Sequence, residues 1–280
     1  MLIRNIQPTT AEVSDLEACR KHLVQYLAPR VDTARFLLMG SHTRGTAIAG
    51  SDMDVLQVIR KKEVTWGGSL VSSNTVLSNI RSTLAGYGRT DVRRDQVALV
   101  VSYKSGVHID LVPGYYSGPG VGNYPVYHIP DGRGGWLSAS PEAHNAYIKA
   151  ADERAGGKLK RTVQIIKYWR RCRVNEIPLN SFHLEIALAS SKVCEGLKSY
   201  SQCVLDAFSE LTSREARAIR DPVGVAGLIS ASATDTMKAS VANSLANSTE
   251  HARNARRAEL QGMPLEAARQ WSTVFNGGFA

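Results

Sequence analysis

Hydrophobic and polar positions follow two different patterns along the chain, and the change falls near residue 140. Before that point, short apolar runs are separated by turns that contain glycine, which is typical of a sheet with a few helices. From Ser140 onward, apolar residues recur with a period of about 3.6, which is typical of amphipathic helices. The pattern predicts an α+β fold in two parts, 1–139 and 140–280.

The first part is predicted to form a small sheet with helices against it. A helix is expected over 11–27, because Val13, Leu16, Leu23 and Leu27 share one stripe. The apolar run 36–39 predicts a buried strand that ends at Gly40-Ser41. Further strands are predicted over 52–59, 97–103 and 107–112, with a helix near 70–85.

The second part is predicted to be a helical lobe. Ser140, Pro141 and Glu142 supply an N-cap, a first-turn proline and a first-turn acid. Clear breaks occur at Gly156-Gly157 and at Asp221-Pro222. Helices are predicted over 141–154, 158–173, 181–198, 200–219, 235–261 and 264–275.

Three acids in the first part suggest a metal site. Asp52 and Asp54 lie two residues apart at a turn-to-strand junction, so both carboxylates should share one face while Met53 and Val55 point into the core. Asp110 is the acid in an otherwise apolar strand. Three such carboxylates can hold two Mg²⁺ or Mn²⁺ ions that align an attacking hydroxyl with a leaving pyrophosphate. We therefore predict Asp52, Asp54 and Asp110 as catalytic metal ligands.

The turn at Gly40-Ser41 is the predicted phosphate cradle. Glycine lets the backbone approach phosphates closely, and Ser41 offers a hydroxyl and exposed N–H donors. Paired acids alone are often solvated or cap neighbouring amides. The combination of GSxxxGT, SDxDV and IDLVP is far more specific. His108, next to the third acid, is interpreted as a strand residue or a residue behind the metal rather than a ligand.

This combination resembles the signature of the DNA polymerase β-like nucleotidyltransferases. The stretch IDLVPGY at 109–115 is similar to the third-acid strand of their bacterial branch related to cyclic GMP-AMP synthase, the CD-NTases of anti-phage CBASS operons. The similarity covers about residues 35–280. Its later matches are WLSASP at 136–141, the helix 157–169, SFHLE at 181–185 and the helix 266–275.

The resemblance implies a polymerase β-like sheet packed on a C-terminal helical lobe that completes a nucleotide-binding cleft. The implied activity is the template-independent joining of NTPs into a cyclic di- or oligonucleotide messenger, with an operon-encoded effector and regulators as partners. In the helical lobe, Lys167 would contact the triphosphate, Ser181 would help to hold it and Phe182 would stack on a base. Gln164, also assigned to substrate binding, departs from the family because related synthases often have a basic residue there.

Helical spacing supports this placement in part. Leu159, Val163, Ile166 and Trp169 form an apolar stripe, while a second face carries Lys160, Gln164, Lys167 and Arg171. The residues of that second face are predicted to line either a cleft or a solvated surface. Phe182 is predicted to lie either in a pocket or in the core.

Two other functions remain open. Antibiotic adenylyltransferases, which add a single NMP to an acceptor, share the pattern GSxxRGxAxxxSDxD, and Arg44, Gly45 and Ala47 fit it. IDLVPGY and SFHLE favour the messenger-synthesising branch. A catalytically inactive nucleic-acid-binding scaffold is disfavoured because all three carboxylates are present.

Composition narrows the class of protein without choosing a partner. The 280 residues are 43% hydrophobic and 21% charged, without a membrane-length apolar run or a secretory signal pattern, so a cytoplasmic globular protein is expected. The net charge of +9 is consistent with a nucleic-acid partner, a triphosphate substrate or a solvated basic surface.

DNA activation of the type known for the animal enzyme is in doubt, because its zinc-binding insertion is absent from this sequence. Cys19, Cys172, Cys194 and Cys203 are too scattered for a disulfide scaffold and favour reduced thiols over a zinc site.

Overall fold

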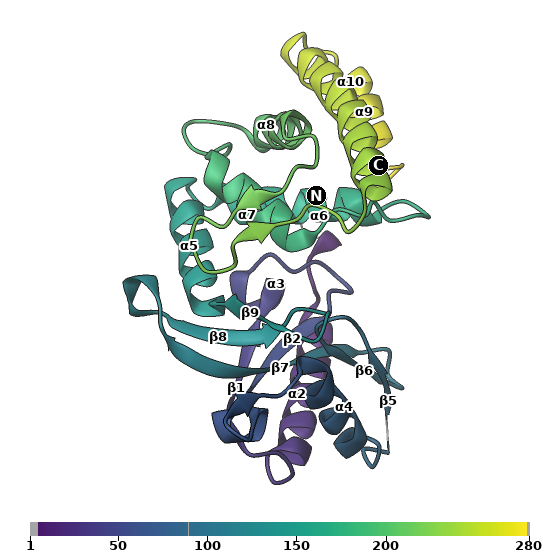
Figure 1. Cartoon of the computed structure of the whole chain (residues 1–280). Coiled ribbons are helices and arrows are strands. Elements are labelled where there is room, and N and C mark those ends of the chain that lie inside the picture. The colour runs from purple at the N-terminus through teal and green to yellow at the C-terminus, as the bar shows by residue number, and fades with distance from the viewer. Residues whose placement is uncertain (1–4, 89, 279–280) are drawn as a thin grey trace. The chain divides into compact units, whose positions relative to one another are not determined.

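The computed structural model describes residues 5–88 and 90–278 (Figure 1). Contacts divide the chain into two compact units. The sheet unit comprises Pro8–Asn145, and the helical unit comprises the chain from Ala146 together with the segment before Pro8. Ile6 is therefore part of the helical unit, where it is buried in the apolar core. The hydrophobic pattern predicts a boundary after residue 139 and assigns residues 5–7 to the first part.

The sheet unit is built on a seven-stranded mixed sheet. The order is β1-β2-β7-β6-β5, and β8 pairs with the far end of β7 and with β9. β2 and β7 run parallel, and the other neighbours run antiparallel. The strands are β1 (Thr33–Met39), β2 (Met53–Ile59), β5 (Thr90–Arg94), β6 (Leu99–Tyr103), β7 (His108–Pro119), β8 (Pro125–Pro130) and β9 (Trp136–Ala139).

Shorter elements complete this unit. They are α2 (Thr10–Leu27), α3 (Gly40–Arg44), η1 (Lys61–Val64), α4 (Ser73–Leu84), η2 (Val121–Asn123) and the hairpin of β3 (Thr65–Trp66) and β4 (Ser69–Leu70). Figure 1 shows α2 and α4 against the sheet. Both helices pack their apolar side chains on one face of it, together with Met53, Val55 and Ile109. A smaller apolar cluster that includes Leu56 and Val112 lies on the opposite face.

Most predicted elements of the sheet unit are present, with three corrections. Val13 is 39% exposed, so it does not belong to the buried stripe of α2. The 36–39 run is only half-buried, because β1 lies at the end of the sheet order. The segment after this strand, predicted as a turn at Gly40-Ser41, forms the short helix α3.

The helical unit has its own apolar core around Trp169 and Phe208, whose rings meet edge to face with centroids 5.2 Å apart. The predicted stripe of Leu159, Val163, Ile166 and Trp169 is confirmed as buried. The unit's elements, with α5 starting inside the sheet unit, are α5 (Pro141–Arg154), α6 (Lys158–Arg171), α7 (Ser181–Ser191), α8 (Tyr200–Ser213), β10 (Ile219–Arg220), β11 (Leu228–Ile229), α9 (Asp235–Leu260) and α10 (Pro264–Val274).

Two predicted helices are too long. The helix expected over 181–198 ends at Ser191, because Lys192 adopts a left-handed conformation with φ of 59°. The helix expected over 200–219 ends at Ser213, since Glu215 and Ala216 also have positive φ. The chain then forms the β10–β11 hairpin.

The cysteines and the longest helices bear on two further predictions. The cysteines are free thiols, and Cys194 and Cys203 are buried. Among the described residues, none of the helices combines the length and apolar character needed to cross a membrane.

Candidate active site

Two of the three predicted ligands lie side by side in the sheet. The parallel register of β2 and β7 places Asp54 opposite Asp110. On its other side, Asp54 is opposite Met39, the last residue of β1. The alternate residues Met53 and Val55 are buried under α2 and α4, so the two acids belong to the opposite face of the sheet. Hydrogen-bonded neighbours therefore hold the backbone of both acids.

Asp52 stands one residue before β2 and is exposed. Its charge nevertheless reaches Asp110. Burial and then the negative charges of Asp52 and Asp95 raise the pKa of the Asp110 carboxyl to about 6. Asp52 therefore lies close enough to Asp110 for like-charge repulsion.

The predicted phosphate turn packs directly against this site. Gly40 has a left-handed φ of +74°, and a Cβ built on it would lie 1.8 Å from Asp54 Oδ2. Both conditions require glycine, because any side chain would be strained and would displace the carboxylate. Ser41 follows in the first turn of α3, and its carbonyl accepts a hydrogen bond from the N–H of Thr46 at 3.0 Å.

The carboxylates of Asp52, Asp54 and Asp110 are suitable ligands for a hard divalent cation, although their side chains do not form a preassembled metal site. Among the described residues, no three His, Cys, Asp or Glu side chains form a group that could hold a metal ion. Carboxylate oxygens are the ligands that Mg²⁺ and Mn²⁺ prefer. Burial contributes most to the raised pKa of Asp110, and a cation here would relieve the like-charge repulsion that adds to it. Metal binding by Asp52, Asp54 and Asp110 stays a prediction.

The polar face of α6 is not a solvated surface at its centre. Gln164 and Lys167 are 3% and 4% exposed. The ammonium of Lys167 donates to Glu185 Oε1 of α7 at 2.5 Å, and Gln164 Oε1 accepts from Arg161 at 3.1 Å. Arg171, near the end of the helix, forms an ion pair with Glu176 at 3.5 Å. The triphosphate contact predicted for Lys167 would thus come from a residue that already has a buried acidic partner.

The two residues predicted at the start of α7 have different surroundings. Ser181 Oγ accepts a hydrogen bond from Arg170 Nη1 at 2.7 Å. Phe182 is partly buried and packs on the apolar core of the helical unit. Asn180 caps the helix by accepting from the N–H of Phe182 at 2.8 Å. These residues belong to the helical unit and the three acids to the sheet unit.

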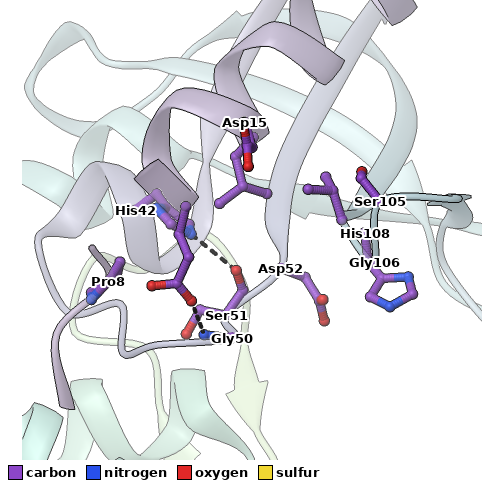
Figure 2. Close-up of a pocket in the computed structure, with 12 residues that line it drawn as sticks. Pro8, Asp15, His42, Gly50, Ser51, Asp52, Ser105, Gly106 and His108 are labelled. Atoms are coloured by element: carbon purple, nitrogen blue, oxygen red, sulfur yellow. Dashed lines mark hydrogen bonds between the residues drawn. The ribbon is translucent and has the colours of Figure 1, made fainter. Parts of the chain in front are cut away.

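Two residues beside Asp52 were not predicted from the sequence. A cavity of about 260 Å³ is lined by the start of α2, the segment around His42 and Asp52, and the turn before β7. Figure 2 shows the residues that line it. Glu12 accepts a hydrogen bond from the N–H of Gly50 at 3.2 Å, and His42 Nε2 lies 3.1 Å from the carbonyl of Ser51. The spacing of Thr9 and Glu12 matches a helix capping box and could have drawn attention to Glu12. No such signal identifies His42.

Known proteins match this chain in sequence and in fold. The model of the Second Messenger Oligonucleotide or Dinucleotide Synthetase domain matches residues 1–152. A cyclic AMP-AMP-AMP synthase of Acinetobacter sp. is 24% identical over 189 residues, covering 63% of this chain and 52% of that protein. A probable cyclic nucleotide synthase of Bacillus cereus is 26% identical over 224 residues, covering 78% and 66%. The chain thus spans about half to two thirds of the length of these relatives.

Solved structures confirm the fold. Escherichia coli MS115-1 CdnC with ATP superposes with a TM-score of 0.77 at 22% identity, covering 99% of this chain and 96% of that one. The CD-NTase CdnG of Bradyrhizobium diazoefficiens superposes with a TM-score of 0.69 at 16% identity, covering 98% and 96%. The predicted α+β, polymerase β-like architecture is therefore correct. Because the family model covers 152 of the 280 residues, the protein belongs to the Second Messenger Oligonucleotide or Dinucleotide Synthetase family.

Proposed function

We propose that this protein joins NTPs, without a template, into a cyclic di- or oligonucleotide that acts as a messenger in anti-phage defence. One observation carries the proposal: Asp54 lies opposite Asp110 on adjoining parallel strands, with Asp52 close enough to repel Asp110. Gly40, which begins the Gly40-Ser41 turn, packs against Asp54. Carboxylates beside a glycine turn are what a metal-assisted transfer of a nucleotide requires.

The relatives support this substrate class. The Acinetobacter relative is named as a cyclic AMP-AMP-AMP synthase, and CdnC and CdnG were solved with ATP and GTP. CdnC was also solved in complex with HORMA-deltaN. From these relatives we propose NTP substrates and a regulatory protein partner for the present chain. From the sequence resemblance we propose an effector encoded in the same operon.

Each residue has a defined part in the proposed reaction. Asp52, Asp54 and Asp110 would hold Mg²⁺ or Mn²⁺, and Gly40 and Ser41 would orient the β- and γ-phosphates. Two bound ions would activate the hydroxyl and neutralise the leaving pyrophosphate. A ribose hydroxyl loses its proton and bonds to the α-phosphorus of the next NTP, while the bond to pyrophosphate breaks. In the last step the terminal hydroxyl attacks the triphosphate of its own chain, which closes the ring.

Product analysis tests the proposal. Purified protein with the four NTPs and Mg²⁺ or Mn²⁺, at neutral and alkaline pH, is expected to form a phosphatase-resistant nucleotide without template. Ring closure consumes every triphosphate, so one pyrophosphate is released per nucleotide in the product. A linear product would release one fewer and keep its triphosphate. Mass spectrometry and a pyrophosphate assay measure both quantities.

The alternative outcomes are equally clear. If the products of an active preparation are only linear and phosphatase-sensitive, the protein does not make a cyclic messenger. If nucleotides are transferred only to an added small acceptor, the protein is an adenylyltransferase-like enzyme. Binding of random DNA or RNA without any turnover would favour an inactive scaffold.

Gly40→Ala is expected to lower nucleotide turnover about a hundredfold. The added Cβ would lie 1.8 Å from Asp54 Oδ2, so the carboxylate has to move away from its place beside Asp110. Steady-state pyrophosphate release measures the effect.

Gly67→Ala is the matched control for this substitution. Gly67 also has a positive φ, of +55°, but a Cβ there meets no atom within 4 Å. Both variants should lose about 1 kcal/mol of stability from backbone strain. Equal turnover in the two variants would show that the contact between Gly40 and Asp54 has no catalytic importance.

A further inference from the structure

The sheet fixes two of the three predicted metal ligands but not the third. Asp54 and Asp110 lie within paired strands, whereas Asp52 precedes the first paired residue of β2, Met53. A ligand held outside a strand ladder depends on the loop that leads to it. The position of Asp52 is therefore set by the segment Ile48–Ser51.

This segment is a tight turn with its own hydrogen bonds. The N–H of Ser51 donates to the carbonyl of Ile48 at 3.0 Å, and Ser51 Oγ accepts from the N–H of Ile48 at 3.0 Å. Gly50 has a φ of +69°, which lets the chain reverse. These bonds shape the turn, but they do not attach it to the rest of the sheet unit.

Two side chains from other elements attach it. Glu12 of α2 accepts from the N–H of Gly50 at 3.2 Å. His42 of α3 lies with Nε2 3.1 Å from the Ser51 carbonyl, and because a carbonyl only accepts, Nε2 is the donor. Figure 2 shows both bonds on the two residues that immediately precede Asp52.

Glu12 divides its carboxylate between two amides. One oxygen accepts from the N–H of Thr9 at 2.7 Å and completes the capping box of α2, and the other holds Gly50. The hydrogen bonds that Glu12 accepts lower the pKa of its carboxyl group, and the backbone N–H of Thr9 makes the largest contribution. Glu12 therefore accepts these hydrogen bonds as a carboxylate. The residue that completes the capping box of α2 is thus also bonded to the turn before Asp52.

We propose that Glu12 and His42 are positioning residues that hold the Gly50-Ser51 backbone and thereby set Asp52 against Asp54 and Asp110. The inference rests on the proposed function, since it assigns these residues to the placement of a metal ligand. Neither residue needs to touch the substrate.

The test compares variants that separate positioning from helix capping. Glu12→Gln leaves a single acceptor oxygen for two amides, whereas Thr9→Ala weakens the cap of α2 and leaves the bond from Glu12 to Gly50 intact. His42→Ala removes the donor to Ser51, and His42→Gln restores an N–H near the same place. Asp52→Asn reports on the metal site itself.

Three properties of each variant are measured in the whole protein. Hydrogen exchange of residues 48–52 reports the attachment of the turn, free Mn²⁺ by electron paramagnetic resonance reports metal binding, and steady-state assays separate kcat from KM. Glu12→Gln and His42→Ala are expected to speed exchange and to weaken Mn²⁺ binding about tenfold, the usual effect of removing a residue behind a metal ligand. They should lower kcat more than they raise KM for NTP. Thr9→Ala should keep Mn²⁺ binding within about twofold, and His42→Gln should recover most of the loss.

The outcomes distinguish this inference from the proposed function. If Asp52→Asn loses Mn²⁺ binding while Glu12→Gln and His42→Ala bind it like the unsubstituted protein, the positioning role is wrong and the metal site stands. If Glu12→Gln and Thr9→Ala behave alike in all three measurements, Glu12 is only a helix cap and its positioning role is wrong. If Asp52→Asn binds Mn²⁺ normally, the metal assignment fails and the inference fails with it.

Discussion

Replacing Asp52, Asp54 or Asp110 by Asn is expected to reduce nucleotide turnover at least a hundredfold, to about the background rate. Loss of a residue behind a metal ligand already costs about 10–100-fold, and these substitutions remove the anionic ligands themselves. The melting temperature should stay close to that of the unsubstituted protein. Asn has nearly the shape of Asp, and Asp52→Asn removes a charge that raises the pKa of Asp110. Pyrophosphate release and thermal scans measure the two quantities.

Asp91→Asn is the matched control for these substitutions. Asp91 is an exposed acid on β5, in the same sheet, and should keep turnover within about twofold, since surface substitutions have small effects. Full activity of Asp54→Asn with either Mg²⁺ or Mn²⁺ would show that the metal ligands are assigned incorrectly.

Lys167→Ala is expected to destabilise the protein by about 3–5 kcal/mol, because it leaves a buried carboxylate without its ammonium partner. The side chains of Lys167 and Glu185 are 5% and 0% exposed, and they join α6 to α7. A denaturant titration of the free energy of unfolding measures this loss. Any rise in KM for NTP in this variant has to be separated from the fall in stability.

The double variant Lys167→Met with Glu185→Gln makes that separation. It removes both charges together and should recover most of the lost stability, since neither buried charge then remains without the opposite charge of its ion pair. If KM for NTP remains high in the double variant, Lys167 contacts the triphosphate as predicted from the resemblance. If KM and stability recover together, its role is confined to the core. A stability loss below about 1 kcal/mol for Lys167→Ala alone would contradict the buried ion pair.

Elements with strong local signals could be predicted from the sequence. α5 occupies Pro141–Arg154 as expected, because its N-terminal proline and first-turn acid are local features. β2 begins at Met53, one residue from its predicted start. Strands β8 and β9 were not predicted. β8 begins and ends with proline and β9 has only four residues, so neither contains the alternating apolar run that is typical of a strand.

The residues of the candidate site could be predicted from the sequence, but their positions relative to one another could not. The chemistry of the three acids and of Gly40 follows from residue type and spacing. The pairing of Asp54 with Asp110 depends on the strand register between segments more than fifty residues apart, which no local pattern encodes. The buried partner of Lys167 is 18 residues away on another helix, and the contact from Glu12 to Gly50 spans 38 residues. Periodicity says which face of a helix is polar, but it does not say what meets that face.

The helical unit contains two separate segments of the chain, so one cut cannot divide the protein into its two units. Because Ile6 is buried in the core of the helical unit while Pro8–Asn145 forms the sheet unit, the backbone passes from one unit to the other at two places. A protease that cuts once near residue 145 would leave the N-terminal fragment still inserted in its neighbour's core through Ile6. Recombinant halves divided at that point would both be incomplete, one with an uncovered isoleucine and the other with an unfilled apolar hole. A clean separation requires a second cut after Gln7, or a rearranged gene that carries residues 1–7 on the C-terminal half.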